Sequence, residues 1–166
     1  MSRQPLWAPW RIAYLGAPKD GDCIFCSKPA AADRKAALVL AVTDYAAVLL
    51  NRYPYANGHV MVAPRVHTAD LSALAPDAHA GLNEVLRRSI ALMQDVFRPD
   101  GMNVGMNLGA AAGAGFADHL HWHLVPRWIG DTNFMPVLAE TRVIPEHLEA
   151  LWERLRPRFA ALEAKP

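Results

Sequence analysis

The chain has 166 residues, of which 52% are hydrophobic and 20% charged, and its formal net charge is +1. These values are typical of a globular protein and argue against polymeric nucleic acid as the partner, whereas a small anion remains compatible. No apolar run approaches the length of a membrane span, and the first residues lack the core of a signal peptide. We therefore expect a cytoplasmic protein that makes no membrane contact.

The length predicts one domain over residues 1–166, divided into three parts. Residues 1–36 are rich in Pro, Gly and aromatic side chains, and we expect them to wrap around the domain. Residues 37–127 form the predicted core, and residues 128–166 form a C-terminal extension that contains a helix.

Two cysteines, Cys23 and Cys26, lie in the N-terminal part with C-x-x-C spacing. Such a pair is half of a zinc site, a redox pair or two ordinary thiols. A redox pair favours a helix start that follows a strand, and the Gly- and Lys-containing surroundings of these cysteines fit that pattern poorly. The pair alone does not decide between the alternatives.

The first regular elements are predicted to be strands. Residues 37–42 and 46–51 are rich in β-formers and are separated by a turn at Thr43-Asp44. A third strand, residues 59–63, follows Asn57-Gly58, a dipeptide that favours tight hairpin turns because both residues tolerate positive φ. These three strands predict an antiparallel meander.

Two helices follow the meander. A short helix runs from its predicted N-cap, Asp70, toward Leu74, and a long helix begins near Pro76. The long helix is predicted to end at residues 98–101, where Arg-Pro-Asp-Gly stops it. Its apolar stripe consists of Leu82, Val85, Leu86, Ile90, Met93 and Phe97.

Two further strands, residues 102–108 and 119–125, flank a loop of small residues at 109–115. The tail from Pro145 is predicted to be helical, and Pro157 is expected to kink or break that helix. The order of strands, helices and strands predicts an α+β domain built on an antiparallel sheet.

Three histidines, His119, His121 and His123, alternate with apolar residues along the last predicted strand. Because successive strand side chains point to opposite faces, the three imidazoles share one face while Leu120, Trp122 and Leu124 share the other. Packing rarely explains three histidines in register, since each half-buried ring needs polar partners. The row therefore predicts a functional site.

Two kinds of chemistry suit this row. The H-x-H spacing is common in catalytic metal sites, and an imidazole is also able to attack phosphorus while its neighbours orient it. The nearby loop at 109–115, with Gly113 and Gly115, exposes backbone N–H groups that phosphate oxygens can approach closely. That loop favours the nucleophilic interpretation.

The run His119-Leu-His-Trp-His-Leu-Val resembles the signature of the histidine triad family, His-φ-His-φ-His-φ-φ with φ hydrophobic. The upstream residues Asn51, Gly58-His59 and Pro64-x-x-His67 resemble a second motif of that family. Two spaced motifs in the right order are highly specific. The resemblance covers residues 23–127. It implies a five-stranded antiparallel sheet with one long and one or two shorter helices, which commonly continues across a homodimer.

The resemblance also implies roles for individual residues. His121 corresponds to the nucleophile that attacks an α-phosphate and forms a nucleotidyl-histidine. With the unperturbed pKa of histidine, this ring is neutral in most molecules at pH 7. His123 corresponds to the residue that assists the leaving group, and His59 to a group beside the phosphate. The remaining implied substrate contacts are Asn51 on the ribose side, Asn107 on the phosphate, Gly113, Gly115, and the carbonyl of His119, which fixes the tautomer of His121.

Some relatives hold a structural zinc with a C-x-x-C pair, the histidine of Pro-x-x-His and the first histidine of the triad. The matching residues here are Cys23, Cys26, His67 and His119. Two thiolates and two imidazoles form the closed tetrahedral set that structural zinc prefers. The resemblance therefore implies a structural zinc and no organic cofactor.

Within the family, the run from Ala114 to Trp128 and the opening Trp7-Ala-Pro-Trp10-Arg resemble bacterial diadenosine tetraphosphate phosphorylases. The phosphoramidase branch usually has a serine where this chain has Phe116. We therefore expect cleavage of dinucleoside polyphosphates, with inorganic phosphate as the acceptor and water as the alternative. Nucleoside phosphoramidate hydrolysis, asymmetric dinucleoside polyphosphate hydrolysis and a nucleotide-binding sensor or interaction module remain the other hypotheses.

Overall fold

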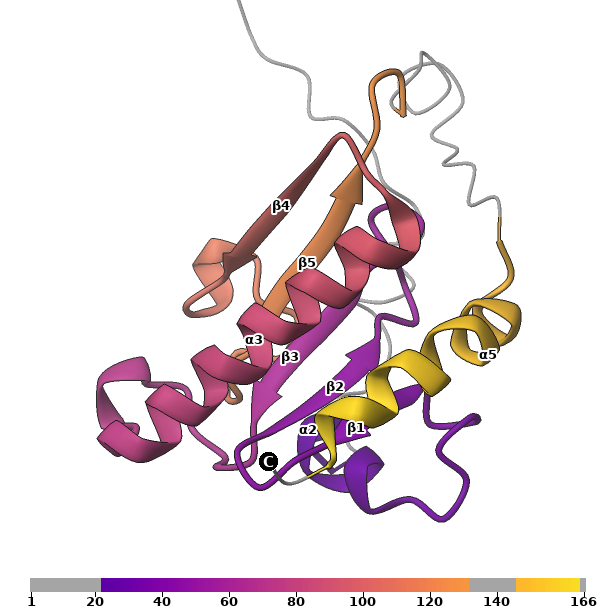
Figure 1. Ribbon diagram of the computed structural model, residues 1–166. Coiled ribbons are helices and arrows are strands. Elements are labelled where there is room, and N and C mark those ends of the chain that lie inside the picture. The colour runs from indigo at the N-terminus through magenta and orange to yellow at the C-terminus, as the bar shows by residue number, and fades with distance from the viewer. Residues whose placement is uncertain (1–21, 132–145, 165–166) are drawn as a thin grey trace, which may run out of the picture.

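The computed structural model describes residues 22–131 and 146–164. A five-stranded antiparallel sheet has the order β1-β2-β3-β5-β4 and is covered on one face by helices α3 and α5 (Figure 1). The predicted α+β class and the predicted number of strands are confirmed. The strands are β1 Val39–Val42, β2 Ala46–Leu50, β3 Val60–Pro64, β4 Gly101–Met106 and β5 Trp122–Arg127.

The β1–β2 hairpin turns at Thr43, as predicted. Its hydroxyl accepts hydrogen bonds from the N–H groups of Tyr45 and Ala46, which closes the turn. The predicted tight hairpin at Asn57-Gly58 is wrong, because nine residues, 51–59, connect β2 to β3. Gly58 has a positive φ of 77°, but Asn57 does not, so the dipeptide forms part of a longer loop.

The long helix α3 spans Pro76–Phe97, and its predicted bounds are confirmed. Arg98 ends it in the left-handed conformation, and the N–H of Arg98 donates to the carbonyl of Gln94. The short predicted helix is a 3₁₀ turn, η2 Leu71–Ala73, and the carboxylate of Asp70 accepts from the N–H of Ser72 as an N-cap.

The C-terminal helix α5, Leu148–Phe159, continues through Pro157 into the 3₁₀ turn η4, Ala160–Leu162. Of the predicted kink or break at Pro157, the break does not occur, because only two residues of α5 follow the proline and few backbone hydrogen bonds depend on it. Buried Leu151, Leu155 and Phe159 pack against the sheet.

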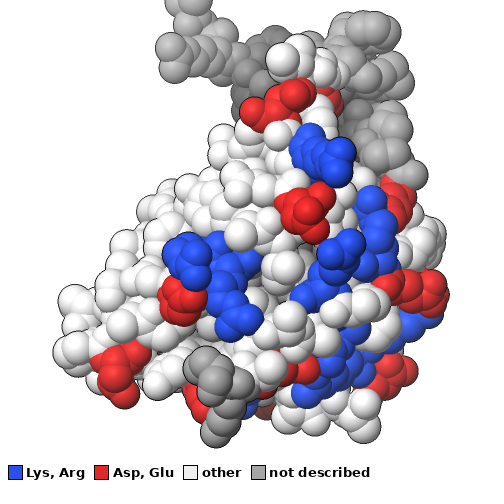
Figure 2. Space-filling view, in the orientation of Figure 1, with Lys and Arg blue, Asp and Glu red and all other residues white. Residues whose placement is uncertain are grey.

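The main core lies between the sheet and the two helices. It joins β-strand residues such as Val62 and Leu124 to α3 residues such as Leu82 and Met93. Trp122 packs against this core, as its inward position predicts. None of the described helices is long and apolar enough to span a membrane. Acidic and basic side chains are interspersed on the helix-covered face (Figure 2).

A second, smaller core lies on the opposite face of the sheet. Its members include Val39, Leu49, Met61 and the buried Phe25, which belongs to the short helix α2, Ile24–Ser27. The turns η1, Lys28–Ala30, and η3, Ala110–Ala112, complete the described elements. The predicted N-terminal Trp7 to Arg11 segment lies outside the described residues.

Candidate active site and metal centre

The histidine row lies on the sheet face that carries Phe25. His123 pairs with Met61 of the smaller core, whereas its neighbour Leu124 belongs to the main core. The predicted strand start at residue 119 is wrong, because β5 begins at Trp122 and the N–H of Leu120 instead donates to the carbonyl of Thr68 at 2.8 Å. The predicted alternation of faces nevertheless holds.

His121 is oriented by the backbone of His119. Its Nδ1 lies 2.9 Å from the carbonyl oxygen of His119, and since a carbonyl only accepts, Nδ1 carries the proton. The Nε2 of His121 therefore holds a free lone pair. Burial lowers the pKa of His121, while its hydrogen bond to the His119 carbonyl opposes that shift. At pH 7 the ring is thus neutral, with its lone pair on Nε2, which is the form that a nucleophilic imidazole requires.

His59 and His123 form a hydrogen-bonded relay. The backbone N–H of Tyr55 donates to Nδ1 of His59 at 3.1 Å, which places the proton of His59 on Nε2. That Nε2–H donates to Nδ1 of His123 at 2.9 Å, so His123 in turn carries its proton on Nε2. The Nε2 atom of His123 is buried and has no hydrogen-bond partner among the described residues. Its N–H is therefore a buried donor that no described acceptor satisfies.

Burial keeps both relay histidines neutral. Desolvation, reinforced by the rings of His123 and His121, lowers the pKa of His59 to about 3. Desolvation and the ring of His121 lower the pKa of His123 to about 4. Near neutral pH each ring therefore has one donor and one acceptor nitrogen, as the relay requires.

Two aromatic residues that sequence reasoning missed contact these histidines. The ring of Phe25 stacks on His121 with centroids 4.7 Å apart, and the ring of Tyr55 lies 4.5 Å from His59 and 5.5 Å from His123. Phe25 lies between the two cysteines of the C-x-x-C pair, and Tyr55 lies between Asn51 and His59 in the upstream motif. That placement is the only sequence signal for them.

The predicted substrate-side amides lie in loops. The side-chain oxygen of Asn51 accepts the N–H of Tyr53 at 2.9 Å and so stabilises the start of the β2–β3 loop. Asn107 is half-buried directly after β4. A substrate contact at either residue stays a prediction.

The small-residue loop contains the 3₁₀ turn η3. Gly113 closes this turn in the left-handed conformation, with a φ of 89°, and its N–H donates to the carbonyl of Ala110 at 2.9 Å. Gly115 is half-buried beside the buried Ala114. Phosphate contacts at Gly113 and Gly115 also stay predictions.

The four predicted metal ligands come together next to the histidine row. The ligand atoms of Cys23, Cys26, His67 and His119 all lie within 4.8 Å of one another. Nδ1 of His119 is 3.3 Å from Sγ of Cys23 and 3.2 Å from Nδ1 of His67.

The protonation of this cluster suits a metal cation. Nε2 of His119 lies 3.0 Å from the carbonyl oxygen of Pro64, which fixes the proton there and leaves the Nδ1 lone pair facing the thiols. Burial and the neighbouring Cys23 thiol raise the pKa of the Cys26 thiol, and a bound cation would offset that cost. Two thiols and two imidazole nitrogens fit tetrahedral zinc.

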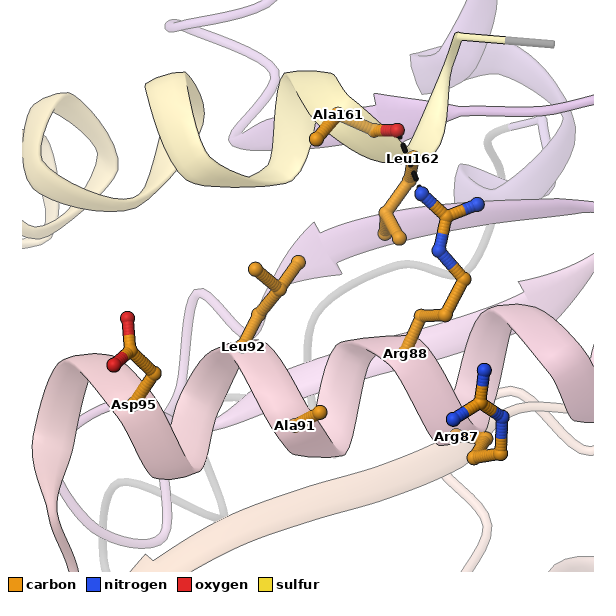
Figure 3. A pocket seen from close by; sticks show the side chains of 7 residues that line it. All are labelled: Arg87, Arg88, Ala91, Leu92, Asp95, Ala161 and Leu162. Atoms are coloured by element: carbon orange, nitrogen blue, oxygen red, sulfur yellow. Dashed lines mark hydrogen bonds between the residues drawn. The ribbon is translucent and has the colours of Figure 1, made fainter. Parts of the chain in front are cut away.

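A groove of about 340 Å³ lies elsewhere, between α3 and η4 (Figure 3). Its wall includes Arg88, which donates to the carbonyl of Ala161 at 2.7 Å, and the apolar Leu92 and Leu162. Both walls belong to the helix-covered face, opposite the histidines. The groove therefore takes no part in the site.

Comparisons with known proteins agree with this geometry. The HIT domain model matches residues 33–128. An AP-4-A phosphorylase from Mycobacterium tuberculosis is 39% identical over 153 residues, which are 87% of this chain and 78% of that protein.

Two solved structures share the fold. A zinc-bound histidine triad family protein from Mycobacterium smegmatis has a TM-score of 0.58 and 26% identity over 93% of this chain and 94% of its own. A histidine triad nucleotide-binding protein from Sulfolobus tokodaii has a TM-score of 0.60 and 27% identity over 74% of this chain and 83% of its own. The chain thus belongs to the HIT family, in the branch that resembles AP-4-A phosphorylase, and is an enzyme of that kind.

Proposed function

We propose that this enzyme cleaves dinucleoside polyphosphates, diadenosine tetraphosphate among them, at an α-phosphate through a nucleotidyl-histidine. One observation carries this proposal: the Nε2 lone pair of His121 and the unpartnered Nε2–H of His123 belong to adjacent rings, whose centroids lie 4.9 Å apart. A nucleophile beside an unused donor is the pair that phosphoryl substitution requires.

In the first step, Nε2 of His121 attacks the α-phosphorus and the bond from phosphorus to the bridging oxygen breaks. The departing oxygen takes the electron pair, and the Nε2–H of His123 stabilises or protonates it. With diadenosine tetraphosphate the leaving group is ATP, and AMP stays attached to His121. The carbonyl of His119 stabilises the positive charge that develops on the ring of His121.

In the second step, an oxygen of inorganic phosphate attacks the same phosphorus, the bond to His121 breaks, and ADP leaves. Water in place of phosphate would yield AMP. The 39% sequence identity to an AP-4-A phosphorylase supports phosphate as the acceptor. The oxygens of the transferred phosphate would meet Asn107, Gly113 and Gly115, and the ribose would meet Asn51.

We also propose that Cys23, Cys26, His67 and His119 hold a structural zinc, supported by their convergence and by the zinc-bound relative. Zinc would fix the position of His119 without taking part in the chemical step. The described metal-ligating cluster includes His119 but neither His121 nor His123, which argues against a catalytic H-x-H metal site.

A homodimer is the proposed assembly. The strand β4 lies at the edge of the sheet and exposes Val104, so its backbone is available to a second copy. Sedimentation velocity would report a mass near twice that of one chain, and a monomer at micromolar concentration would contradict this assembly.

Product analysis with diadenosine tetraphosphate, with and without inorganic phosphate, tests the proposed function. ATP plus ADP formed only with phosphate supports phosphorolysis. ATP plus AMP in both samples would replace phosphate by water as the acceptor. No turnover in either sample would contradict the proposal and favour a phosphoramidate substrate or a nucleotide sensor.

A further inference from the structure

The nucleophile is held by its backbone hydrogen bond at one point only. The bond from Nδ1 of His121 to the carbonyl of His119 fixes one ring atom, and this bond alone would leave the ring free to tilt about that axis. Attack on phosphorus requires the Nε2 lone pair to point along the bond that forms. A second contact with the face of the ring is therefore needed.

Phe25 supplies that contact. Its ring lies 4.7 Å from the ring of His121 with an interplanar angle of 27°, which is a stacked arrangement. Phe25 is 2% exposed and His121 is 3% exposed, so neither ring has room to move away. The same phenyl ring lies 5.2 Å from His119, the residue whose carbonyl holds His121.

The proposed metal centre in turn fixes Phe25. The helix α2 that carries it has four residues, too few for a helix to be stable on its own. The N–H groups of Cys26 and Ser27 both donate to the carbonyl of Cys23 at 2.9 Å, and the thiols of the two cysteines face His119. Phe25 thus lies between the two cysteines, on a turn that the ligand cluster secures.

We propose that Phe25 is a positioning residue that holds the imidazole plane of His121 for attack, so that the C-x-x-C turn is coupled to catalysis through a ring stack. The inference rests on His121 being the nucleophile. Phe25 would then have a role in catalysis in addition to its packing in the smaller core.

The substitution Phe25→Leu tests this inference, because it keeps an apolar side chain but removes the flat ring. We expect kcat for diadenosine tetraphosphate to fall by about tenfold to a hundredfold while KM changes by less than about twofold. The loss should remain when zinc is supplied in excess. A normal kcat, or a loss that disappears with added zinc, would overturn the proposal.

The matched control is Phe159→Leu, the same change at a fully buried site in the main core on the other face of the sheet. Both variants should melt at lower temperature, since each leaves a cavity. Only Phe25→Leu should lower kcat per folded molecule. Equal kcat losses in the two variants would show that packing alone is responsible and would overturn the proposal.

A readout without substrate separates this inference from the proposed function. Nitrogen–proton NMR correlations of the histidine rings report the Nδ1–H of His121, whose signal is assigned by its absence in His121→Gln. We expect Phe25→Leu to shift or broaden that signal and Phe159→Leu to leave it unchanged. An unchanged signal in Phe25→Leu would overturn the positioning role, even if the wild-type enzyme fails to cleave diadenosine tetraphosphate.

Discussion

The chain uses histidine in two neighbouring clusters that differ in what the ring nitrogens face. In the proposed metal cluster, the Nδ1 atoms of His67 and His119 lie together with two thiols, all within 4.8 Å of one another. In the proposed catalytic cluster, Nε2 of His59 donates to Nδ1 of His123, and Nε2 of His123 has no hydrogen-bond partner among the described residues. Convergence of lone pairs suits a cation, whereas a relay of donors and acceptors suits the movement of a proton.

His119 connects the clusters by using different atoms for each. Its Nδ1 faces the thiols, its Nε2 faces the carbonyl of Pro64, and its own carbonyl holds His121. The role of each histidine thus follows from the backbone groups around it, since these carbonyls and N–H groups fix which nitrogen carries the proton.

The largest effect should follow removal of the nucleophile. His121→Ala is expected to lower kcat by at least about 10⁴-fold, because no other described residue supplies a nucleophilic nitrogen at that position. Nucleotide binding should persist. Steady-state kinetics and calorimetric titration with a non-cleavable nucleotide measure the two quantities. The exposed His79 provides the control, and His79→Ala should match the wild type. Appreciable turnover by pure His121→Ala would refute the nucleophile assignment.

Loss of a metal ligand should affect stability first. Cys26→Ser is expected to lower the zinc content and to cost about 4 kcal/mol of unfolding free energy, which lowers Tm by roughly 8–16 °C in a chain of this size. Elemental analysis and thermal denaturation measure both effects. Ser27→Ala, one residue further along α2, serves as the control. A zinc-free wild type with the same Tm as Cys26→Ser would contradict the metal assignment.

The loss of kcat on removing the Nε2–H donor of His123 should depend on how much the leaving group needs a proton. His123→Gln is expected to lower kcat about 100-fold for diadenosine tetraphosphate, a typical share for a general acid. For a nitrophenyl ester of AMP, whose leaving group needs no proton, kcat should fall much less. An equal loss for both substrates would show that His123 does not act on the leaving oxygen.

The smallest effect concerns pH and stability. The pKa of His59 falls from 6.5 to about 3 on folding. Between these pH values His59 is protonated in the unfolded chain but not in the folded chain. Stability from this ring is complete above pH 6.5 and is lost as the pH falls, by about 1.4 kcal/mol per pH unit. Urea unfolding between pH 7 and 5, where few carboxylates titrate, should show a shallower pH dependence for His59→Gln. Identical slopes would contradict neutral burial of His59.

The fold was largely predictable from local pattern. The stripe along α3 and the β-rich runs set the element order, and the Asp70 cap marked a helical turn. The errors fall where tertiary contacts override local preference, as in the loop around Gly58, where an added β-carbon would lie 2.7 Å from the ring of Phe97. Pro157 gave a misleading signal because a proline near a helix end removes few backbone hydrogen bonds.

The candidate site was only partly predictable. Alternation along the strand places His119, His121 and His123 on one face, but the resemblance supplied the link to His59, His67 and the cysteines. The aromatic contacts of Phe25 and Tyr55 depend on how α2 and the β2–β3 loop fold over the sheet. No sequence period encodes such contacts between distant segments.

The covalent step is the central claim, and rapid-quench mass spectrometry of the intact enzyme tests it directly. Mixed with diadenosine tetraphosphate in the absence of inorganic phosphate, the wild type should gain the mass of one AMP group. Fragmentation should place that group on His121, and added phosphate should remove it as ADP. Turnover without any adduct, or an adduct on His59 or His123, would contradict the mechanism.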